Sequence, residues 1–203
     1  MNPLLVIHHQ LVRIPRTDLV AGAIAELARQ ARSVLDVGTG DGLVAAAVAN
    51  RLGASVEGVD IQPQAGSAVK VRSYDGSRLP FDDAAFDVVV LSDILHHAED
   101  PLAVLSEALR VARRAAIVKD HFAFGAWSAR WLLALDWVGN AKQRIPAPGN
   151  YLTPSSWLAL VEDARGVVAK QIWPLDVHVS PLHLLTRSRL QFAARVEHAP
   201  GSR

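Results

Sequence analysis

Cysteine is absent from this chain of 203 residues, so disulfides, thiolate metal sites and cysteine nucleophiles are excluded. A strong charge of either sign is missing as well, because 21 Lys and Arg residues stand against 20 Asp and Glu residues. Proteins that follow nucleic-acid phosphates usually carry a clear basic excess, so we expect no nucleic-acid partner. The chemistry must therefore come from histidines, carboxylates, hydroxyls or a bound cofactor.

The N-terminal segment has none of the marks of a membrane anchor or a secretion signal. Met1–Val12 is apolar, but it is too short to span a bilayer, lacks a basic leader and includes His8 and His9. We therefore expect a cytoplasmic protein without stable membrane insertion, in which this segment caps the fold. Half of the residues are apolar, which is enough for one sizeable core and favours a single domain over residues 1–203.

Short apolar runs alternate with helical patterns along most of the chain. This alternation predicts an α/β fold with a doubly wound, mostly parallel sheet, whose ligand lies beyond the carboxyl ends of the strands. Residues 1–32 are expected to form an N-terminal cap and approach helix, 33–120 the cofactor-binding core, 121–193 the acceptor side and 194–203 a tail. The expected strands are Ser33–Val37, Ser55–Val59, Val69–Ser73, Phe86–Leu91, Ala115–Lys119, Val167–Trp173 and Leu182–Phe192.

Helix boundaries follow from capping residues and prolines. Thr17 is the expected N-cap of the approach helix, which continues to Ser33. Asp100 followed by Pro101 marks a second clear start, and Arg110, Arg113 and Arg114 are expected at the end of that helix, where they suit its dipole. Further helices are expected over Leu43–Leu52, over Phe124–Asn140 and from Thr153–Pro154 to near Gly166.

A glycine-rich turn joins the first predicted strand to the helix that follows it. Its spacing is G-x-G-x-G over residues 38–42, and Leu43 stands where a dinucleotide fingerprint needs a third glycine. A nicotinamide oxidoreductase is therefore disfavoured. Asp36 in the turn would repel a pyrophosphate but suits a ligand that carries positive charge, such as the sulfonium and ammonium of S-adenosylmethionine.

Carboxylates also stand at the ends of the next two predicted strands. Asp60 lies where a carboxylate accepting hydrogen bonds from ribose hydroxyls is expected. Ile61 is placed to pack on an adenine face, and Asp75 to accept from the adenine amino group. The open alternative is that Asp60 and Asp75 are solvated loop residues.

Five motifs in this order carry a family resemblance: Val34–Gly42, Gly58–Asp60, Asp75–Phe81, Phe86–Ser92 and Leu95–Pro101. Over residues 33–120 the sequence resembles the class I methyltransferases, particularly the small-molecule and quinone or sterol type. The resemblance implies a seven-stranded sheet with an antiparallel last strand. It also implies S-adenosylmethionine as cofactor, with S-adenosylhomocysteine as product. The cofactor contacts that it implies are Asp36, Gly38, Thr39, Gly40, Asp60, Ile61, Asp75 and Gly76, with Ser92 lining the methionine end.

The end of the fifth predicted strand offers residues for acid–base chemistry. A base is needed only if the acceptor must lose a proton, and His121 is the first candidate, with Asp120 orienting it or binding the substrate. His97, or its neighbour His96, is a further candidate on the acceptor side. The competing interpretation is a hydrogen-bonded structural pair. We expect no metal site at His96, His97 and Asp100, because adjacent histidines should point apart and the family needs no metal.

All five tryptophans lie beyond residue 120. Trp127 and Trp131 at helical spacing are typical of a core, although a tryptophan-rich segment beside the crevice also predicts an apolar small-molecule acceptor. A helix stripe of this kind fits a core or a twin subunit equally, which leaves a homodimer open. The expected function is methyl transfer to O, N or C of that acceptor; the alternative is a non-catalytic S-adenosylmethionine-binding or assembly protein.

Overall fold

The computed structural model describes residues 13–140, 150–177 and 188–201. Its centre is one seven-stranded sheet in the order β3-β2-β1-β4-β5-β7-β6. The strands are β1 (Ser33–Val37), β2 (Ser55–Asp60), β3 (Val71–Ser73), β4 (Phe86–Ser92), β5 (Ala112–His121), β6 (Gly166–Ile172) and β7 (Gln191–His198). β7 is antiparallel to both of its neighbours, β5 and β6, whereas the other pairings are parallel. The predicted fold class and antiparallel last strand are confirmed.

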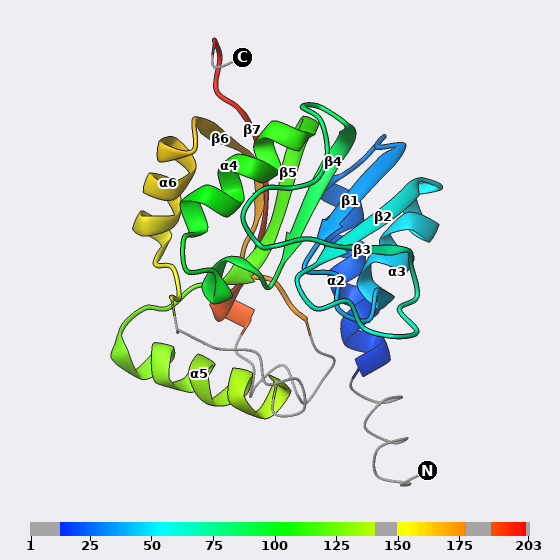
Figure 1. The fold of residues 1–203 in the computed structure, drawn as a ribbon. Coiled ribbons are helices and arrows are strands. Elements are labelled where there is room, and N and C mark those ends of the chain that lie inside the picture. The colour runs from blue at the N-terminus through cyan, green and yellow to red at the C-terminus, as the bar shows by residue number, and fades with distance from the viewer. Residues whose placement is uncertain (1–12, 141–149, 178–187, 202–203) are drawn as a thin grey trace, which may run out of the picture.

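Helices cover both faces of the sheet, as Figure 1 shows. On one face lie α2 (Ile14–Leu27) and α3 (Leu43–Leu52), and on the other lie α4 (Pro101–Val111) and α6 (Pro154–Asp163). The helix α5 (Ala126–Asn140) lies beyond the edge at which β4 and β5 end, apart from the two helix layers (Figure 1). A three-residue helix η2 (Leu95–His97) follows β4, and a second, η3 (Ser188–Leu190), precedes β7.

The alternating direction of side chains along the strands builds two hydrophobic cores. In β1, Val34 packs with α2 and α3 whereas Leu35 packs with α4 and α6, and in β5 Ile117 and Val118 divide in the same way. Because both faces are covered, the middle parts of β4 and β5 are apolar. Polar residues are therefore confined mainly to the strand ends, where the candidate site lies.

Several boundaries differ from the sequence-based expectations. The last strand is Gln191–His198 and not 182–192, so Ala194–His198 belong to the sheet rather than to a tail; 178–187 lie outside the described residues. The approach helix begins at Ile14 and ends at Leu27, because a proline next to Ile14 starts it and Ala28 caps it. Thr17 is therefore inside the helix.

The three arginines expected at the end of α4 are divided between α4 and β5. Only Arg110 lies in the last turn, because the chain enters β5 at Ala112. Arg113 donates to the Asp87 carboxylate at 2.9 Å, and Arg114 donates to the carbonyl of Gln30 at 2.9 Å. These two arginines therefore tie the sheet together at the amino ends of β1 and β4 and do not interact with the α4 dipole.

The expected core role of the tryptophans on α5 is wrong. Trp127 is 85% exposed and Trp131 is 42% exposed, whereas Leu132, the residue after Trp131, is buried. Among the tryptophans whose side chains the structure describes, Trp157 on α6 enters the core, where it packs beside Phe192. Within the described ranges, no helix has the length and apolar character needed to cross a membrane.

Candidate cofactor and acceptor site

The glycine turn closes tightly against β2. The amides of Gly38 and Thr39 donate to the carbonyl of Val59 at 2.8 and 3.2 Å, and the amide of Gly40 donates to the Asp60 carboxylate at 2.8 Å. Gly38 has a φ of 70°, and a Cβ at that position would lie 2.1 Å from Cδ1 of Ile94. Only glycine fits there. The turn therefore joins the carboxyl ends of β1, β2 and β4 at one place.

Asp36 is a buried carboxylate near the end of β1, just before this turn. Its side chain is among the few buried charged groups, and burial, reinforced by the Asp60 carboxylate, raises the pKa of Asp36 to about 7. Within the described residues, no lysine or arginine forms an ion pair with it. A cationic ligand placed here would relieve the repulsion between the two carboxylates. The residues present thus fit the positively charged cofactor predicted from the sequence.

The expected adenosine-side residues lie next to the turn. Asp60 ends β2, and the exposed Ile61 that follows it lies 3.3 Å from where a Cβ of Gly76 would be. Asp75 is exposed and accepts from the amide and hydroxyl of Ser77, bonds that lower the pKa of the Asp75 carboxyl. The structure therefore brings Ile61 and Gly76 together beside Asp60, and keeps Asp75 as a charged loop residue.

The ends of β4 and β5 hold a second polar cluster, on the acceptor side. Asp120 is fully buried: its Oδ2 accepts from the amide of Leu95 at 3.0 Å, and its Oδ1 lies 2.6 Å from Nδ1 of His96. Although burial alone would raise it, the pKa of Asp120 is held well below its usual range by His96 and by hydrogen bonds. Because an ionised carboxylate only accepts, Nδ1 of His96 carries the proton.

His121, at the end of β5, is the second imidazole beside Asp120. Its Nδ1 lies 3.4 Å from Oδ1 of Asp120 and 3.5 Å from Oδ1 of Asp93. Burial, and then the neighbouring Lys119 ammonium, lower the pKa of His121. The ring is therefore neutral at neutral pH and able to accept a proton.

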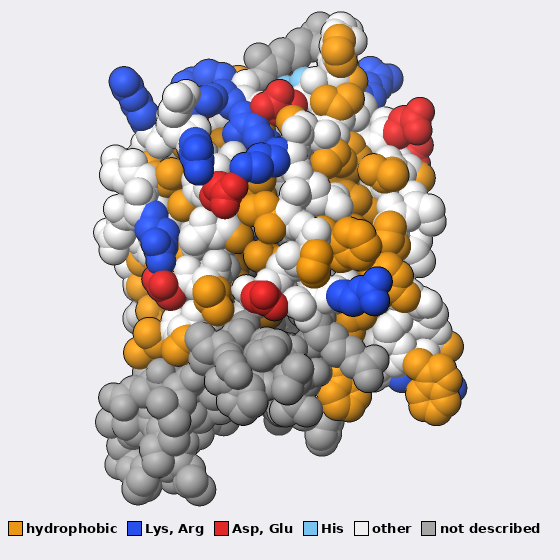
Figure 2. Space-filling model, turned by 180° about the vertical axis from the view of Figure 1, so that it is seen from behind, with side chains coloured by type: hydrophobic (Ala, Val, Ile, Leu, Met, Phe, Trp, Pro, Cys, Tyr) orange, Lys and Arg blue, Asp and Glu red, His pale blue; other side chains and the backbone are white. Residues whose placement is uncertain are grey.

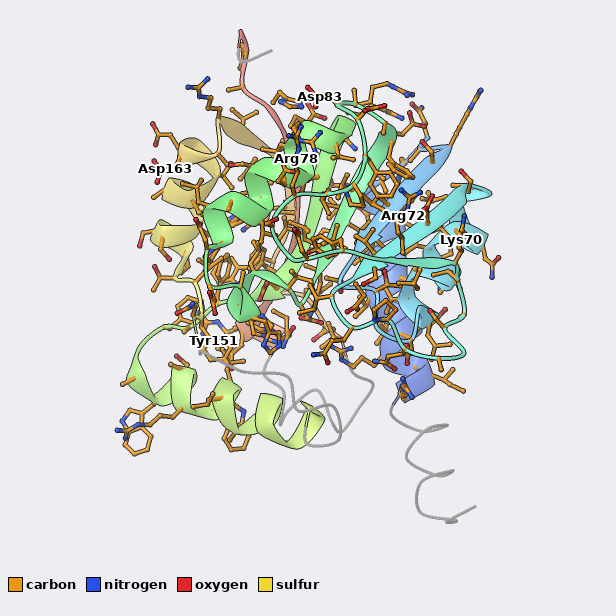
Figure 3. All side chains as sticks on the ribbon, viewed as in Figure 1. Lys70, Arg72, Arg78, Asp83, Tyr151 and Asp163 are labelled. Atoms are coloured by element: carbon orange, nitrogen blue, oxygen red, sulfur yellow. The ribbon has the colours of Figure 1, made fainter. Side chains whose placement is uncertain are left out.

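An aromatic group completes the cluster. The rings of His96 and His97 pack with centroids 4.1 Å apart, so the expectation that these neighbours point apart is wrong. Tyr151 stacks on His96 with centroids 5.4 Å apart and lies at the end of the sheet nearest α5 (Figure 3). Sequence reasoning offered His96 only as the alternative to His97 and gave Tyr151 no role, because only the tertiary fold brings residues 96, 120 and 151 together.

His96, His97 and Asp100, which were considered above as possible metal ligands, do not form such a group among the described residues. Asp100 instead caps α4, accepting from the amide of Ala103 at 3.0 Å. The structure groups His96, Asp120 and His121, whose candidate ligand atoms lie within 4.8 Å of one another. The 2.6 Å contact between His96 and Asp120 is a hydrogen-bond distance. The expected lack of a metal site stays a prediction, and these three residues are the place to test it.

Other surface features lie away from this cluster. A shallow groove is lined by Arg78, Leu79, Pro80, Phe81, Asp82 and Ala85. Arg78 lies toward the end of the molecule that carries Asp83, far from Tyr151 (Figure 3). The opposite face of the molecule intersperses basic and acidic side chains (Figure 2). Neither feature competes with the strand ends as a candidate site.

Comparisons with known proteins agree with this geometry. Residues 35–118, which span β1 to β5, match the family described as "Methyltransferase domain". Over these residues the chain is similar to the methyltransferase family, as the sequence motifs had indicated. The matched segment includes the glycine turn, Asp60 and the end of β4.

Individual relatives match mainly this same core. An uncharacterized methyltransferase of Mycobacterium sp. (strain KMS) is 39% identical over 98 residues, which cover 45% of this chain and 38% of the relative. A ubiquinone biosynthesis O-methyltransferase of Thiobacillus denitrificans is 31% identical over 94 residues, covering 40% of each chain. The match thus spans about two fifths of the length of these relatives.

A solved structure resembles most of this chain. The 1,6-didemethyltoxoflavin-N1-methyltransferase of Burkholderia thailandensis, with 1,6-didemethyltoxoflavin and S-adenosylhomocysteine bound, superposes with a TM-score of 0.62. The alignment covers 91% of this chain and 78% of that one at 17% identity. At this identity the likeness establishes the shared fold.

Proposed function

We propose that this methyltransferase transfers a methyl group from S-adenosylmethionine to an O, N or C atom of an apolar small molecule. The observation that carries the proposal is the buried Asp36 carboxylate, which lies beside Asp60 at the glycine turn without a cationic partner among the described residues. Bound S-adenosylmethionine supplies a methyl group already activated by its positively charged sulfur. The protein's own part is to hold and align the reactants.

The cofactor side divides into three contacts in this proposal. Asp36 balances the positive charge of the methionine end, and Ser92 at the end of β4 lines it. Gly38, Thr39 and Gly40 form the turn that lets the ligand approach the backbone. The ribose hydroxyls bind Asp60, and the adenine lies between Ile61 and Gly76, with Asp75 accepting from its amino group.

On the acceptor side we assign proton removal to His121. Its lowered pKa keeps the imidazole neutral, and Asp120 lies close enough to orient it. His121 is 7% exposed against 1% for His96, so it is the imidazole nearer the surface. His97 packs on His96 and is retained as the second candidate. The apolar acceptor would enter past Tyr151 and the tryptophan-bearing helix α5.

Support for a small-molecule acceptor comes from the relatives as well as from the site. One is named for ubiquinone biosynthesis, and the toxoflavin enzyme was solved with bound 1,6-didemethyltoxoflavin. Basic and acidic side chains are interspersed on the face in Figure 2, which does not favour a polyanionic substrate.

The test is cofactor binding measured by calorimetry with S-adenosylhomocysteine. We expect Asp60→Ala to weaken binding by about 10- to 100-fold, the range for hydrogen bonds to a charged group. Asp163→Ala on the outer helix α6 is the matched control and should leave binding unchanged. Equal affinities for the wild type and Asp60→Ala would contradict the ribose assignment.

Turnover separates an enzyme from a non-catalytic cofactor-binding protein. The purified protein is incubated with S-adenosylmethionine and a metabolite extract, and S-adenosylhomocysteine is quantified. We expect its formation to depend on extract. Tight cofactor binding without methylated product across broad acceptor panels would favour the assembly-protein alternative.

A further inference from the structure

The ring nitrogen Nδ1 of His121 faces two carboxylates. It lies 3.4 Å from Oδ1 of Asp120 and 3.5 Å from Oδ1 of Asp93. The nitrogen is buried, and neither contact has the geometry of an ordinary hydrogen bond. Contacts of catalytic groups are often long or poorly aligned before a ligand binds, so either aspartate is close enough to be the partner. Which of them holds this nitrogen decides how the imidazole is oriented.

Both carboxylates are ionised, and this fixes the proton on the ring. Although burial alone would raise it, the pKa of Asp93 is held well below its usual range by the Lys119 and Arg16 cations. The pKa of Asp120 is also low, for the reasons given above. An unprotonated Nδ1 would turn its lone pair toward two negatively charged oxygens, whereas a protonated Nδ1 points a donor at them. The neutral His121 ring therefore carries its proton on Nδ1 and its lone pair on Nε2.

The oxygen of Asp120 that faces His121 is already fully used. Its Oδ1 accepts from Nδ1 of His96 at 2.6 Å and from the backbone amide of His121 at 2.7 Å. A carboxylate oxygen offers about two lone pairs, so these two bonds fill it. Asp120 is therefore the partner of His96 and of the His121 backbone.

Asp93, directly after β4, has the acceptor site that Asp120 lacks. Within the described residues, its Oδ1 accepts one hydrogen bond, from Nζ of Lys119 at 2.5 Å, which leaves a second lone pair for His121. Its Oδ2 accepts from Nη2 of Arg16 at 3.0 Å, and its amide donates to the carbonyl of Lys119 at 2.8 Å. Contacts from α2 and β5 thus hold this carboxylate in place beside the imidazole.

The backbone of Asp93 is in a conformation that costs energy in a non-glycine residue. Its φ is 58°, in the left-handed region. Such strain persists where the surroundings enforce it and clusters at functional sites. Asp93 follows Ser92, the residue assigned to the methionine end, and Ser92 pairs in register with Lys119. Asp93 therefore lies where the cofactor side and the acceptor side meet.

We propose that Asp93, and not Asp120, is the positioning residue of His121, holding the ring proton on Nδ1 so that Nε2 takes the proton of the acceptor. The inference rests on the proposed function, in which His121 is the base. The carboxylate then has two effects: it orients the ring before the reaction, and it stabilises the imidazolium that forms when Nε2 is protonated.

The proton and the electron pairs balance in this step. The bond between the acceptor atom and its hydrogen breaks, and the proton goes to Nε2 of His121. The electron pair of that bond stays on the acceptor atom and forms the new bond to the methyl carbon. The electron pair of the carbon–sulfur bond leaves with the sulfur, which becomes the neutral thioether of S-adenosylhomocysteine.

Nuclear magnetic resonance measures the tautomer of His121 without any acceptor. The whole chain is labelled with ¹⁵N in histidine, and long-range ¹H–¹⁵N correlation spectra distinguish a protonated ring nitrogen from a bare one. His121→Gln identifies the signals of His121 by their loss. At neutral pH we expect the Nδ1-protonated form in at least about tenfold excess, because a hydrogen bond to a charged acceptor favours it by that much. A majority of the Nε2-protonated form would overturn the proposal.

Asp93→Asn and Asp120→Asn are a matched pair, because each removes one charge beside the same imidazole. Asp93→Asn should reduce the excess of Nδ1-protonated His121 by about tenfold and leave the signals of His96 unchanged. Asp120→Asn should shift the signals of His96 and leave the tautomer of His121 unchanged. General loosening of the strand ends would instead move both histidines in both variants.

Two results with these variants would overturn the role of Asp93. One is an unchanged His121 tautomer in Asp93→Asn, and the other is an equal change of that tautomer in Asp120→Asn. Circular dichroism checks that both variants are folded. The wild-type spectrum decides the tautomer even if Asp93→Asn does not fold.

Calorimetry with S-adenosylhomocysteine on the same samples separates this inference from the proposed function. A wild type that binds the nucleoside but carries the His121 proton on Nε2 overturns the role of Asp93 and leaves the cofactor site standing. A wild type that holds the proton on Nδ1 but does not bind the nucleoside overturns the proposed function, while the pairing of Asp93 with His121 stands.

Discussion

Asp36 and Asp120 are two buried aspartates of the same sheet edge, and their surroundings give them opposite acidities. Asp36 faces Asp60, and burial reinforced by that carboxylate raises its pKa to about 7. Asp120 is also buried, but His96 and hydrogen bonds hold its pKa well below the usual range. The sequence shows both aspartates. The protonation of each depends on a group 24 residues away in the chain, which is Asp60 for Asp36 and His96 for Asp120.

Cofactor binding should depend on pH through Asp36. The cation pairs with the ionised carboxylate, so it binds best where Asp36 has lost its proton. Because the pKa of Asp36 is about 7 in the free protein, affinity should rise as the pH increases toward 7 and level off above it. The limit is about tenfold per pH unit. Calorimetry with S-adenosylmethionine at pH 6, 7 and 8 measures this.

Asp36→Asn is the variant that checks the assignment of this pH dependence. It should bind the cofactor weakly at every pH and show a flat profile over the same range. A variant that kept the wild-type slope would assign the titration to another group.

The ion pair of Asp93 with Lys119 predicts a stability effect at the scale of one residue. Asp93→Asn leaves the fully buried Lys119 ammonium without its carboxylate, which should lower the free energy of unfolding by about 3 to 5 kcal/mol. Asp83→Asn is the comparison, because Asp83 pairs with Arg110 from a 77% exposed position and should cost less than about 1 kcal/mol. Urea unfolding of both variants measures the two losses in free energy of unfolding. Equal losses would contradict the argument from the buried ion pair.

At the scale of elements, local signals located most helices and strands but not all of their ends. The glycine turn, α3 and the start of α4 follow from residues that are adjacent in sequence, and they were predicted correctly. The last strand was misplaced because 182–192 is as apolar as a strand needs to be. What selects Gln191–His198 is its antiparallel pairing with β5 and β6, which no local pattern records.

The start of α4 provides a prediction at this scale. Asp100→Ala removes the side-chain acceptor of the Ala103 amide and should lower the free energy of unfolding by about 1 kcal/mol. Asp100→Ser should recover most of this loss, because serine also caps helices. Neither variant should alter S-adenosylhomocysteine affinity. A loss of affinity in Asp100→Ala would show that this residue reaches the site.

For the whole molecule, the order of the strands decides which side chains meet. β4 and β5 are neighbours, and η2 lies at their carboxyl ends, so His96, Asp120 and His121 gather there from segments about 25 residues apart. Sequence reasoning expected His121, Asp120 and His97 on this side, but gave no role to Arg16 or Asp93. Those two residues are separated by 77 positions in the chain, and nothing near either one indicates the other.

Removal of metal ions tests this cluster in the intact protein. We expect treatment with EDTA to leave cofactor affinity and turnover unchanged. The physical reason is that Nδ1 of His96 carries a proton and both oxygens of Asp120 already accept hydrogen bonds. Activity lost with EDTA and restored by Zn²⁺ or Mg²⁺ would make the three residues a metal centre.

The sequence by itself determined the fold class, the glycine turn with its acidic neighbour, and the carboxylate at the end of β2. These features depend on hydrophobic periodicity and on residues close together in the chain, which act through local backbone geometry. Only the tertiary structure decided the last strand, the pairing of His96 with Asp120, and the network of Arg16, Asp93 and Lys119. Burial and charge pairing act between groups that are neighbours in space, and folding alone makes those groups neighbours.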